Sequence, residues 1–67
     1  MRVILNGKQV ELAADIVSIS RLLSAYQLRE KIVVVELNGE IIDRSRYETQ
    51  AIADGDRIEI VHFVGGG

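Results

Sequence analysis

The residues best placed to do chemistry in this sequence are its last three. Gly65, Gly66 and Gly67 follow Phe63-Val64 at the end of an apolar stretch. A terminal carboxylate is inert until it is activated, and a mixed anhydride with AMP is the usual means. Because glycine lacks Cβ, a glycine tail can pass a narrow channel and leave its carbonyl carbon open to attack. The sequence predicts that Gly67 carries the reactive carboxyl and that Gly65 and Gly66 thread it into a partner's active site.

Other reactive side chains are scarce. The sequence contains no cysteine and a single histidine, His62. Disulfides, thiolate metal sites and thiol nucleophiles are thus absent, and a zinc site would need carboxylates for most of its ligands. We expect no catalytic side chain, no metal and no cofactor bound by the chain itself. We interpret His62 as a strand residue at a sheet edge, with a base or ligand role as the alternative, because no sequence neighbour completes a site.

Length and composition restrict the classes of function. A single domain of 67 residues buries only about 60% of the surface that its unfolded chain exposes, which leaves little room for a catalytic cavity. We therefore expect a carrier or binding protein and not an enzyme. The net charge of −2, with scattered cations and 4% aromatic residues, argues against nucleic-acid binding. No signal peptide or membrane-spanning apolar run is evident, so we expect a cytoplasmic protein without a membrane partner.

The elements that must position the glycine tail begin with a hairpin and a helix. Strands are predicted over residues 1–5 and 8–12, joined by Asn6-Gly7, a dipeptide typical of type I′ turns. A helix is predicted next, with Ser18 as its N-cap and its end between residues 27 and 29. Its apolar residues share one face because their spacing is i, i+3, i+4 and i+7: Ile19, Leu22, Leu23 and Tyr26.

The second half of the chain is predicted to be mostly strand. The expected elements are a β-branched strand over 32–37, a turn at 38–39, a short strand over 40–42, a helical turn over 45–50, a turn at 54–56 and a final strand over 57–64. On the final strand, alternation places Ile58 and Ile60 on one face. The other face carries Glu59, Val61 and Phe63.

This order of elements predicts an α+β fold. The helix lies between the hairpin and the third strand, so the connection can be a right-handed crossover between parallel strands. We expect a mixed sheet of four to five strands with one main helix packed on one face. The folded domain is predicted to span residues 1–64, followed by a flexible glycine tail over residues 65–67.

The same features resemble one known family. The Asp54-Gly55-Asp56 turn, the strand over 58–64 and the Gly66-Gly67 end are similar to the ThiS family of sulfur carriers in thiamine biosynthesis, as is the order of hairpin, helix and strand. The family fold is the ubiquitin-like β-grasp. The resemblance covers the whole chain, with Gly65 as an extra glycine before the usual pair. The diglycine end is shared with related carriers, but the short chain favours ThiS over the molybdopterin-synthase small subunit, which is the alternative.

The resemblance implies a protein co-substrate that carries sulfur on Gly67. An E1-like adenylyltransferase of the ThiF type would adenylate the Gly67 carboxylate with ATP and Mg²⁺. A cysteine-derived persulfide would then displace AMP and leave a thiocarboxylate, so that Gly67 becomes 1-thioglycine. Thiazole synthase of the ThiG type would take the sulfur into the thiazole ring. We expect a monomer when the carrier is free, because it must move between these partners.

Val61, Phe63 and Val64 form the predicted docking surface for the partners, because an exposed apolar patch beside the tail often marks a partner site. The alternative is that residues 41–52 cover this face of the sheet. Two other classes of function stay open from the residues alone. One is a β-grasp module that binds without covalent chemistry and has an incidental tail; the other is a modifier that forms amide bonds with lysines.

Charged residues give weaker indications. Arg44 and Arg46 are expected in a solvated loop, with contact to an acidic partner as the alternative. Glu36 and Glu59 could pair with arginines across strands. Several acidic residues lie in the C-terminal half and either steer the domain toward a basic partner or serve as ordinary solubilising charge.

Overall fold

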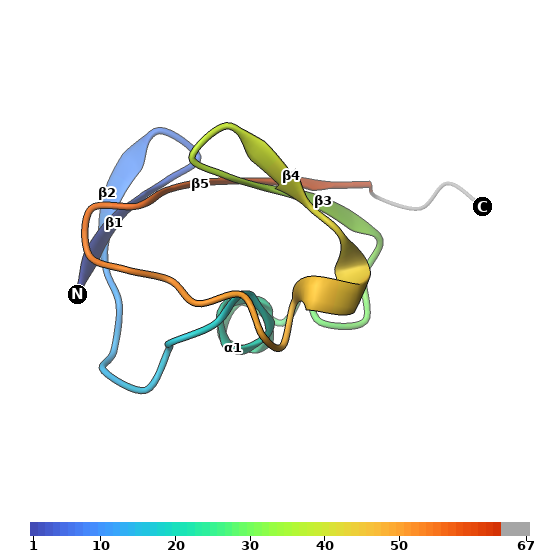
Figure 1. The fold of residues 1–67 in the computed structure, drawn as a ribbon, viewed down its shortest axis with the longest axis horizontal. Helices are drawn as coiled ribbons and strands as arrows, with labels where there is room; N and C mark the ends of the chain where they lie inside the picture. Colours follow the sequence, from blue (N-terminus) through green and yellow to red (C-terminus); the bar gives the residue numbers. More distant parts are fainter. Residues whose placement is uncertain (64–67) are drawn as a thin grey trace.

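Five strands and two short helices follow one another along the described part of the chain. The computed structural model describes residues 1–63. Its elements, in chain order, are β1 (Arg2–Leu5), β2 (Lys8–Glu11), α1 (Ile19–Ala25), β3 (Val33–Leu37), β4 (Glu40–Ile42), the 3₁₀-helix η1 (Arg44–Arg46) and β5 (Arg57–His62). The strands form a single mixed sheet in the order β2-β1-β5-β3-β4. The predicted α+β architecture, with one main helix on one face, is confirmed (Figure 1).

Two Asn-Gly turns close the two hairpins of this sheet. Asn6 and Gly7 have φ of +49° and +82°, and Asn38 and Gly39 have φ of +52° and +86°. Two successive positive φ values are the type I′ geometry, whose twist matches that of the paired strands. The β1–β2 and β3–β4 pairs are antiparallel as predicted. Asn38 bonds to Asp56 and Arg57 at the start of β5, and Asn6 bonds to Ile58 and Ile60 further along that strand.

Helix α1 is shorter than the sequence predicts. Ser18 caps it as expected, because the Ser18 hydroxyl accepts a hydrogen bond from the Arg21 backbone N–H at 3.2 Å. The helix ends at Ala25, two residues before the predicted limit, because Gln27 has a φ of +59°, which right-handed helix does not allow. A helix of 7 residues is unstable alone and depends on its packing against the sheet.

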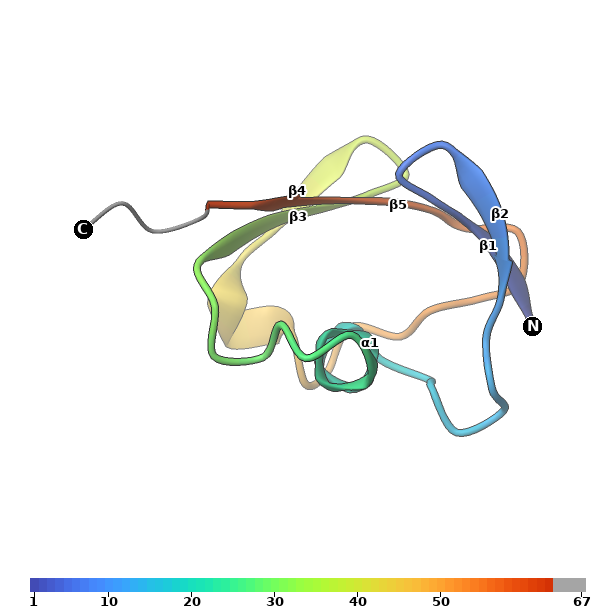
Figure 2. The same cartoon turned by 180° about the vertical axis from the view of Figure 1, so that it is seen from behind.

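The core lies between α1 and one face of the sheet, as Figures 1 and 2 show from opposite sides. β5 is the central strand, parallel to β1 and antiparallel to β3. The buried apolar residues come from every layer of the fold: Val3, Leu5, Leu12, Ile19, Leu22, Leu23, Val35, Leu37, Ile42, Ile52, Ile58 and Ile60. Within the described residues, no helix has the length and apolarity that a membrane crossing needs.

The segment between β4 and β5 packs on the helix side of the sheet. η1 spans only residues 44–46, where the sequence predicts a helical turn over 45–50. Ile42 and Ile52 are buried in the core, and the Ile52 backbone N–H donates to the Val17 carbonyl at 3.1 Å. This segment therefore leaves the opposite face of the sheet open.

Candidate functional site

β5 carries the chain to the predicted reactive terminus. Ile58 and Ile60 are buried against the core, whereas Val61 and Phe63 are each 53% exposed on the other side. The predicted alternation along this strand is therefore confirmed, although the strand ends at His62 and not at residue 64. The predicted reactive residue Gly67, the threading residues Gly65 and Gly66, and the docking residue Val64 lie outside the described residues.

Chain length limits where a partner's active site can lie. Four residues follow Phe63 in the sequence, and an extended chain spans at most about 3.6 Å per residue. The four residues after Phe63 therefore span at most about 14 Å. A partner that reacts with this carboxyl must contact the end of the domain where β5 terminates.

The sheet face opposite the helix is apolar at this end. Val61 lies opposite Val34 on β3, and the Phe63 backbone N–H donates to the Ile32 carbonyl at 3.1 Å. The outer patch, as we name it, consists of Ile32, Val34, Ile41, Val61 and Phe63. The alternative, that residues 41–52 cover this face, is wrong, because Ile42 and Ile52 are buried in the core and Ile41 is 66% exposed. Ile32, which is 74% exposed, and Ile41 extend the patch beyond the predicted docking residues.

Two glutamates lie directly opposite each other beside this patch. Glu36 on β3 pairs with Glu59 on β5, and Glu36 also faces Ile41 on β4. The predicted pairing of these glutamates with arginines is wrong, since the ion pairs within residues 1–63 involve Glu11, Glu40 and Glu48 instead. Like charges directly opposite on a sheet are destabilising, so this position contributes acidity to the outer face and not stability.

A second apolar surface lies on the helix side of the same end. We name it the hairpin groove: it has a volume of about 410 Å³ and is lined by Leu5, Asn6, Lys8, Val10, Tyr26, Leu28, Ile60 and His62. His62 lies in a strand as predicted, but the predicted sheet edge is wrong, because β5 is the central strand and His62 pairs with Val33 on β3. It is the last residue of β5, and its exposed side chain borders this groove. Within residues 1–63, no group of three or more metal-ligating side chains gathers. His62 thus has no partners for a metal site in that part of the chain.

The loop around η1 shows how its charges are held. The Asp43 carboxylate accepts hydrogen bonds from the Ser45 hydroxyl and the Ser45 backbone N–H, and these bonds lower the pKa of Asp43 below its ordinary value of 3.8. Burial raises the pKa of the Tyr47 phenol above 10.0. Arg46 donates to the Gln50 side chain at 2.6 Å and lies 3.9 Å from Glu40. Arg44 and Arg46 therefore lie in an exposed loop as expected, and contact with an acidic partner stays a prediction.

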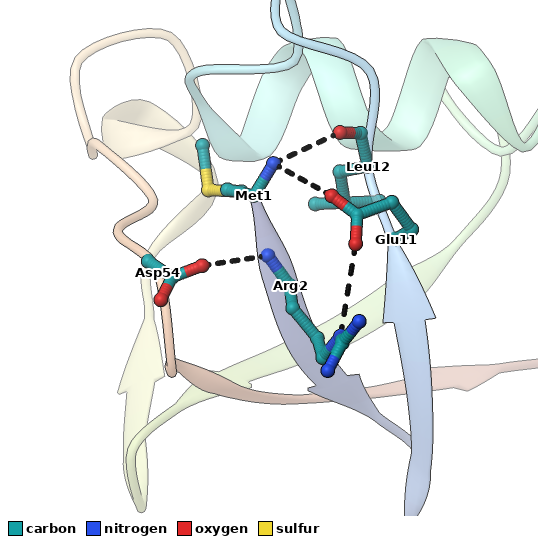
Figure 3. Close-up of polar contacts among 5 residues, drawn as sticks. All are labelled: Met1, Arg2, Glu11, Leu12 and Asp54. Carbon is teal, nitrogen blue, oxygen red and sulfur yellow. Dashed lines mark hydrogen bonds and ion pairs between the residues drawn. The ribbon is translucent and has the colours of Figure 1, made fainter.

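The opposite end of the sheet is closed by polar contacts (Figure 3). The Met1 amine lies 3.1 Å from Glu11 and donates to the Leu12 carbonyl at 3.2 Å. Asp54 accepts from the Arg2 backbone N–H at 2.7 Å, and Asp56 accepts from the Ala53 backbone N–H at 2.8 Å. The two aspartates of the Asp54-Gly55-Asp56 turn thus hold the entry into β5, at the opposite end of this strand from His62. Sequence reasoning predicted the turn but not these hydrogen bonds of its two carboxylates.

Comparison with known proteins agrees with this architecture over the full length. A model of the ThiS family matches residues 3–67. The chain belongs to the ThiS family. It is 56% identical over 63 residues to the sulfur carrier protein ThiS of Bacillus subtilis (strain 168), which covers 94% of this chain and 96% of that protein. This membership confirms the family that the turn, the final strand and the glycine end suggest.

Solved structures and longer relatives extend the comparison. The crystal structure of the thiamine biosynthesis protein ThiS from Geobacter metallireducens matches this ThiS-family chain with a TM-score of 0.83, 35% identity and full coverage of both chains. The ubiquitin-like fold is thereby confirmed. The chain is also 37% identical, over its whole length, to one fifth (20%) of the thiazole synthase of Paramagnetospirillum magneticum. That thiazole synthase therefore contains a segment similar to a ThiS-family chain.

Proposed function

We propose that this ThiS-family chain is a sulfur carrier of thiamine biosynthesis that holds its sulfur as a thiocarboxylate on Gly67. The observation that carries the proposal is the family match, which extends through residue 67 and includes a sulfur carrier that is 56% identical. The chain acts as a co-substrate and not as a catalyst. The sequence has no cysteine that could carry sulfur on a side chain, which leaves the terminal carboxyl as the carrier.

The proposed chemistry takes place on the terminal carboxylate. An oxygen of the Gly67 carboxylate attacks the α-phosphorus of ATP, and pyrophosphate leaves. The terminal sulfur of a cysteine-derived persulfide then attacks the carbonyl carbon and displaces AMP. A thiol reductant cleaves the remaining S–S bond and frees the thiocarboxylate. ATP and Mg²⁺ serve the E1-like activating enzyme, and this chain binds neither cofactor itself.

Docking in this proposal uses the outer patch. Its exposed side chains Val61 and Phe63 lie next to the tail, within the roughly 14 Å that the last four residues can span. Exposed apolar patches that gather in one place mark interaction sites. Glu36 and Glu59 stand beside the patch and would favour a partner surface with a basic group at that position.

Two partners are proposed. The first is an E1-like adenylyltransferase, which the adenylation step requires. The second is a thiazole synthase, because two thiazole synthases contain segments 37% and 33% identical to this chain over all of its 67 residues. Two activities joined in one polypeptide commonly meet in function as separate proteins, so the likeness supports contact between this carrier and a thiazole synthase. A cytoplasmic location, where ATP and a cysteine desulfurase are available, is part of the same proposal.

The test is the intact mass of the chain after incubation with a ThiF-type adenylyltransferase, ATP, cysteine and a cysteine desulfurase. We expect a gain equal to the exchange of one oxygen for one sulfur, located on the C-terminal peptide. A variant lacking Gly67 and a variant with alanine added after Gly67 should both stay unmodified. The Glu30→Gln variant, changed at an exposed loop position, is the matched control and should be modified like the parent.

Two results would contradict the proposal. Modification of the extended variant would show that the reactive carbonyl is not that of Gly67. An unmodified parent chain, in a reaction that converts the Bacillus subtilis carrier, would show that the tail is not a substrate for this chemistry.

A further inference from the structure

We infer that the end of β5 is an open strand edge, to which a thiazole synthase adds an extended segment of its own chain. This inference rests on the proposed function for the identity of the partner. It goes beyond the outer patch, because it concerns backbone hydrogen bonds and the helix-side groove. The segment would lie alongside β5, in line with β1 and beyond the point where β1 ends.

The hydrogen bonds of β5 alternate between its two neighbours. The Phe63 N–H donates to the Ile32 carbonyl on the β3 side, and antiparallel pairing directs every second residue of β5 to β3. The intervening residues point to the β1 side, where the Asn6 N–H donates to the Ile58 carbonyl at 2.9 Å. By the same alternation, the backbone N–H and C=O of His62 point to the β1 side.

Asn6 marks where the pairing with β1 stops. The register of β1 and β5 ends at the Leu5–Ile58 pair. Beyond this pair, the Asn6 side chain makes the hydrogen bonds that a neighbouring strand would make. Its Oδ1 accepts from the Ile60 N–H at 2.8 Å, and its Nδ2 donates to the Ile60 carbonyl at 3.3 Å. The chain turns away at Gly7 into β2. Among residues 1–63, no strand accompanies β5 past Asn6, so the edge is open at His62.

The hairpin groove lies beneath this open edge. Leu5, Val10, Leu28 and Ile60 give it an apolar lining, and His62 itself borders it. Side chains of an added strand alternate between the two faces of a sheet. One residue of the segment would therefore insert into the groove, and its neighbours would lie over the outer patch next to Val61. A single extended segment thus contacts both apolar surfaces of this end.

The length of the tail favours this edge over the open β2 edge of the sheet. β2 is also an edge strand, and the backbone groups of Gln9 point away from β1. Gln9 pairs with Ile4 on β1, and Ile4 pairs with Arg57 on β5, so Gln9 lies level with Arg57. Arg57 precedes Phe63 by six residues, which is about 20 Å along a strand. His62 adjoins Phe63, so the β5 edge lies nearer than the β2 edge to the place where a protein that receives the tail must sit. The occupant is therefore the receiving protein, and Lys8 on the groove lining favours an acidic residue in its segment.

The experiment uses a matched pair of proline variants. His62→Pro removes the backbone N–H donor on the open edge. The hydrogen bonds between β5 and β3 are kept, because the His62 N–H makes no bond to β3, and proline is tolerated at such a position. His62→Thr removes the imidazole but keeps the donor. Gln9→Pro makes the same change on the β2 edge. Each variant is titrated into a purified thiazole synthase of the same organism, and amide hydrogen exchange of the ¹⁵N-labelled parent is followed with and without the synthase.

We expect His62→Pro to weaken binding about tenfold, the effect of roughly one lost hydrogen bond and its unpaired acceptor. His62→Thr and Gln9→Pro should bind within about twofold of the parent, and the His62 amide of the parent should exchange more slowly in the complex. Thermal unfolding of all variants serves as the fold control. If His62→Pro has the same Tm as the parent, the two binding affinities can be compared directly. If its Tm is lower, the inference is tested instead by whether the His62 amide of the parent exchanges more slowly in the complex.

Several results would overturn the inference. Equal binding of His62→Pro and the parent, or equal loss in His62→Pro and His62→Thr, would show that the backbone donor is not used. Protection at Gln9 instead of His62 would place the segment on the β2 edge, and a parent that does not bind the synthase would remove the partner. A concentration-dependent dimer that His62→Pro abolishes would assign the edge to a second copy. Binding is measured on the unmodified chain, so a failure of thiocarboxylate formation would contradict the proposed function and leave this test intact.

Discussion

Substitution of Asn6 tests how the fold holds the strand that leads to the tail. The Asn6 side chain makes two hydrogen bonds with the backbone of Ile60, at 2.8 Å and 3.3 Å, in a partly buried position. Each bond contributes about 1 kcal/mol net. Asn6 also has a φ of +49°, a left-handed conformation that costs alanine about 1 kcal/mol more than asparagine or glycine. Asn6→Ala should therefore lose about 3 kcal/mol of unfolding free energy and Asn6→Gly about 2 kcal/mol.

The size of this loss makes it easy to measure. A domain of 67 residues has a total stability of about 3–10 kcal/mol, and 1 kcal/mol lowers its Tm by about 4–8 °C. Urea unfolding followed by circular dichroism gives the free energy, with an unchanged m-value expected because the same surface is exposed. Asn6→Asp keeps the acceptor for the Ile60 N–H and loses only the donor, so it should lie about 1 kcal/mol below the parent.

Asn38 provides the matched control. It occupies the same place in the second Asn-Gly turn and also bonds to the β5 region, since it accepts from the Arg57 N–H at 2.9 Å and donates to Asp56 at 3.0 Å. These bonds are exposed, so Asn38→Ala should cost less than Asn6→Ala. Equal stability of Asn6→Gly and Asn6→Ala would refute the conformational part of the reasoning. Three Asn6 variants within about 0.5 kcal/mol of the parent would refute the hydrogen-bond part.

Three further predictions concern the entry into β5, the η1 loop and the outer patch. Gly55→Ala should lower the unfolding free energy by about 1–2 kcal/mol and Gly55→Asn by less, because φ is +88° and an added Cβ meets no atom within 4 Å; urea titration of both checks this. The depressed pKa of Asp43 means that its contribution to stability is present above about pH 4 and is lost as pH falls through the lower folded-state pKa, so Asp43→Asn should flatten the acid limb of a Tm-against-pH curve. Val61→Glu should reduce the rate of thiocarboxylate formation at least tenfold, whereas Gln9→Glu on the same face should not; an unchanged Tm with an unchanged rate would exclude the outer patch.

Much of the fold follows from patterns that are local in the sequence. The two Asn-Gly dipeptides, the i, i+3, i+4 spacing around Leu22 and the alternation of Ile58 and Ile60 each depend on neighbours in the chain, and each is confirmed by the structure. The helix end was predicted too late, because the left-handed conformation of Gln27 has no marker such as glycine at that position.

The candidate site is less accessible to sequence reasoning, because it is assembled across strands. Register decides that Glu36 faces Glu59, and only a shift of two residues would have brought it opposite Arg57. The exposure of Ile41 depends on where residues 42–52 pack, which no local pattern shows. The bonds from Asn6 to Ile60 join positions 54 residues apart. The only signal for them was that an asparagine, whose side chain can both donate and accept, occupies each turn beside β5.

The two ends of β5 differ in a way that fits a carrier which must present its terminus. At the entry, Asp54 and Asp56 bind backbone N–H groups, and the Met1 amine and Glu11 close the neighbouring hairpin. At the exit, Val61 and Phe63 are exposed and the β1 side of His62 has no strand beside it within residues 1–63. Local opening follows the number of buried contacts and protected hydrogen bonds, so the exit should open at lower free energy than the entry. A partner that adds a strand beside His62 and covers the outer patch would give the exit the hydrogen bonds and buried contacts that the entry already has. Binding would then also raise the free energy of local opening at the exit.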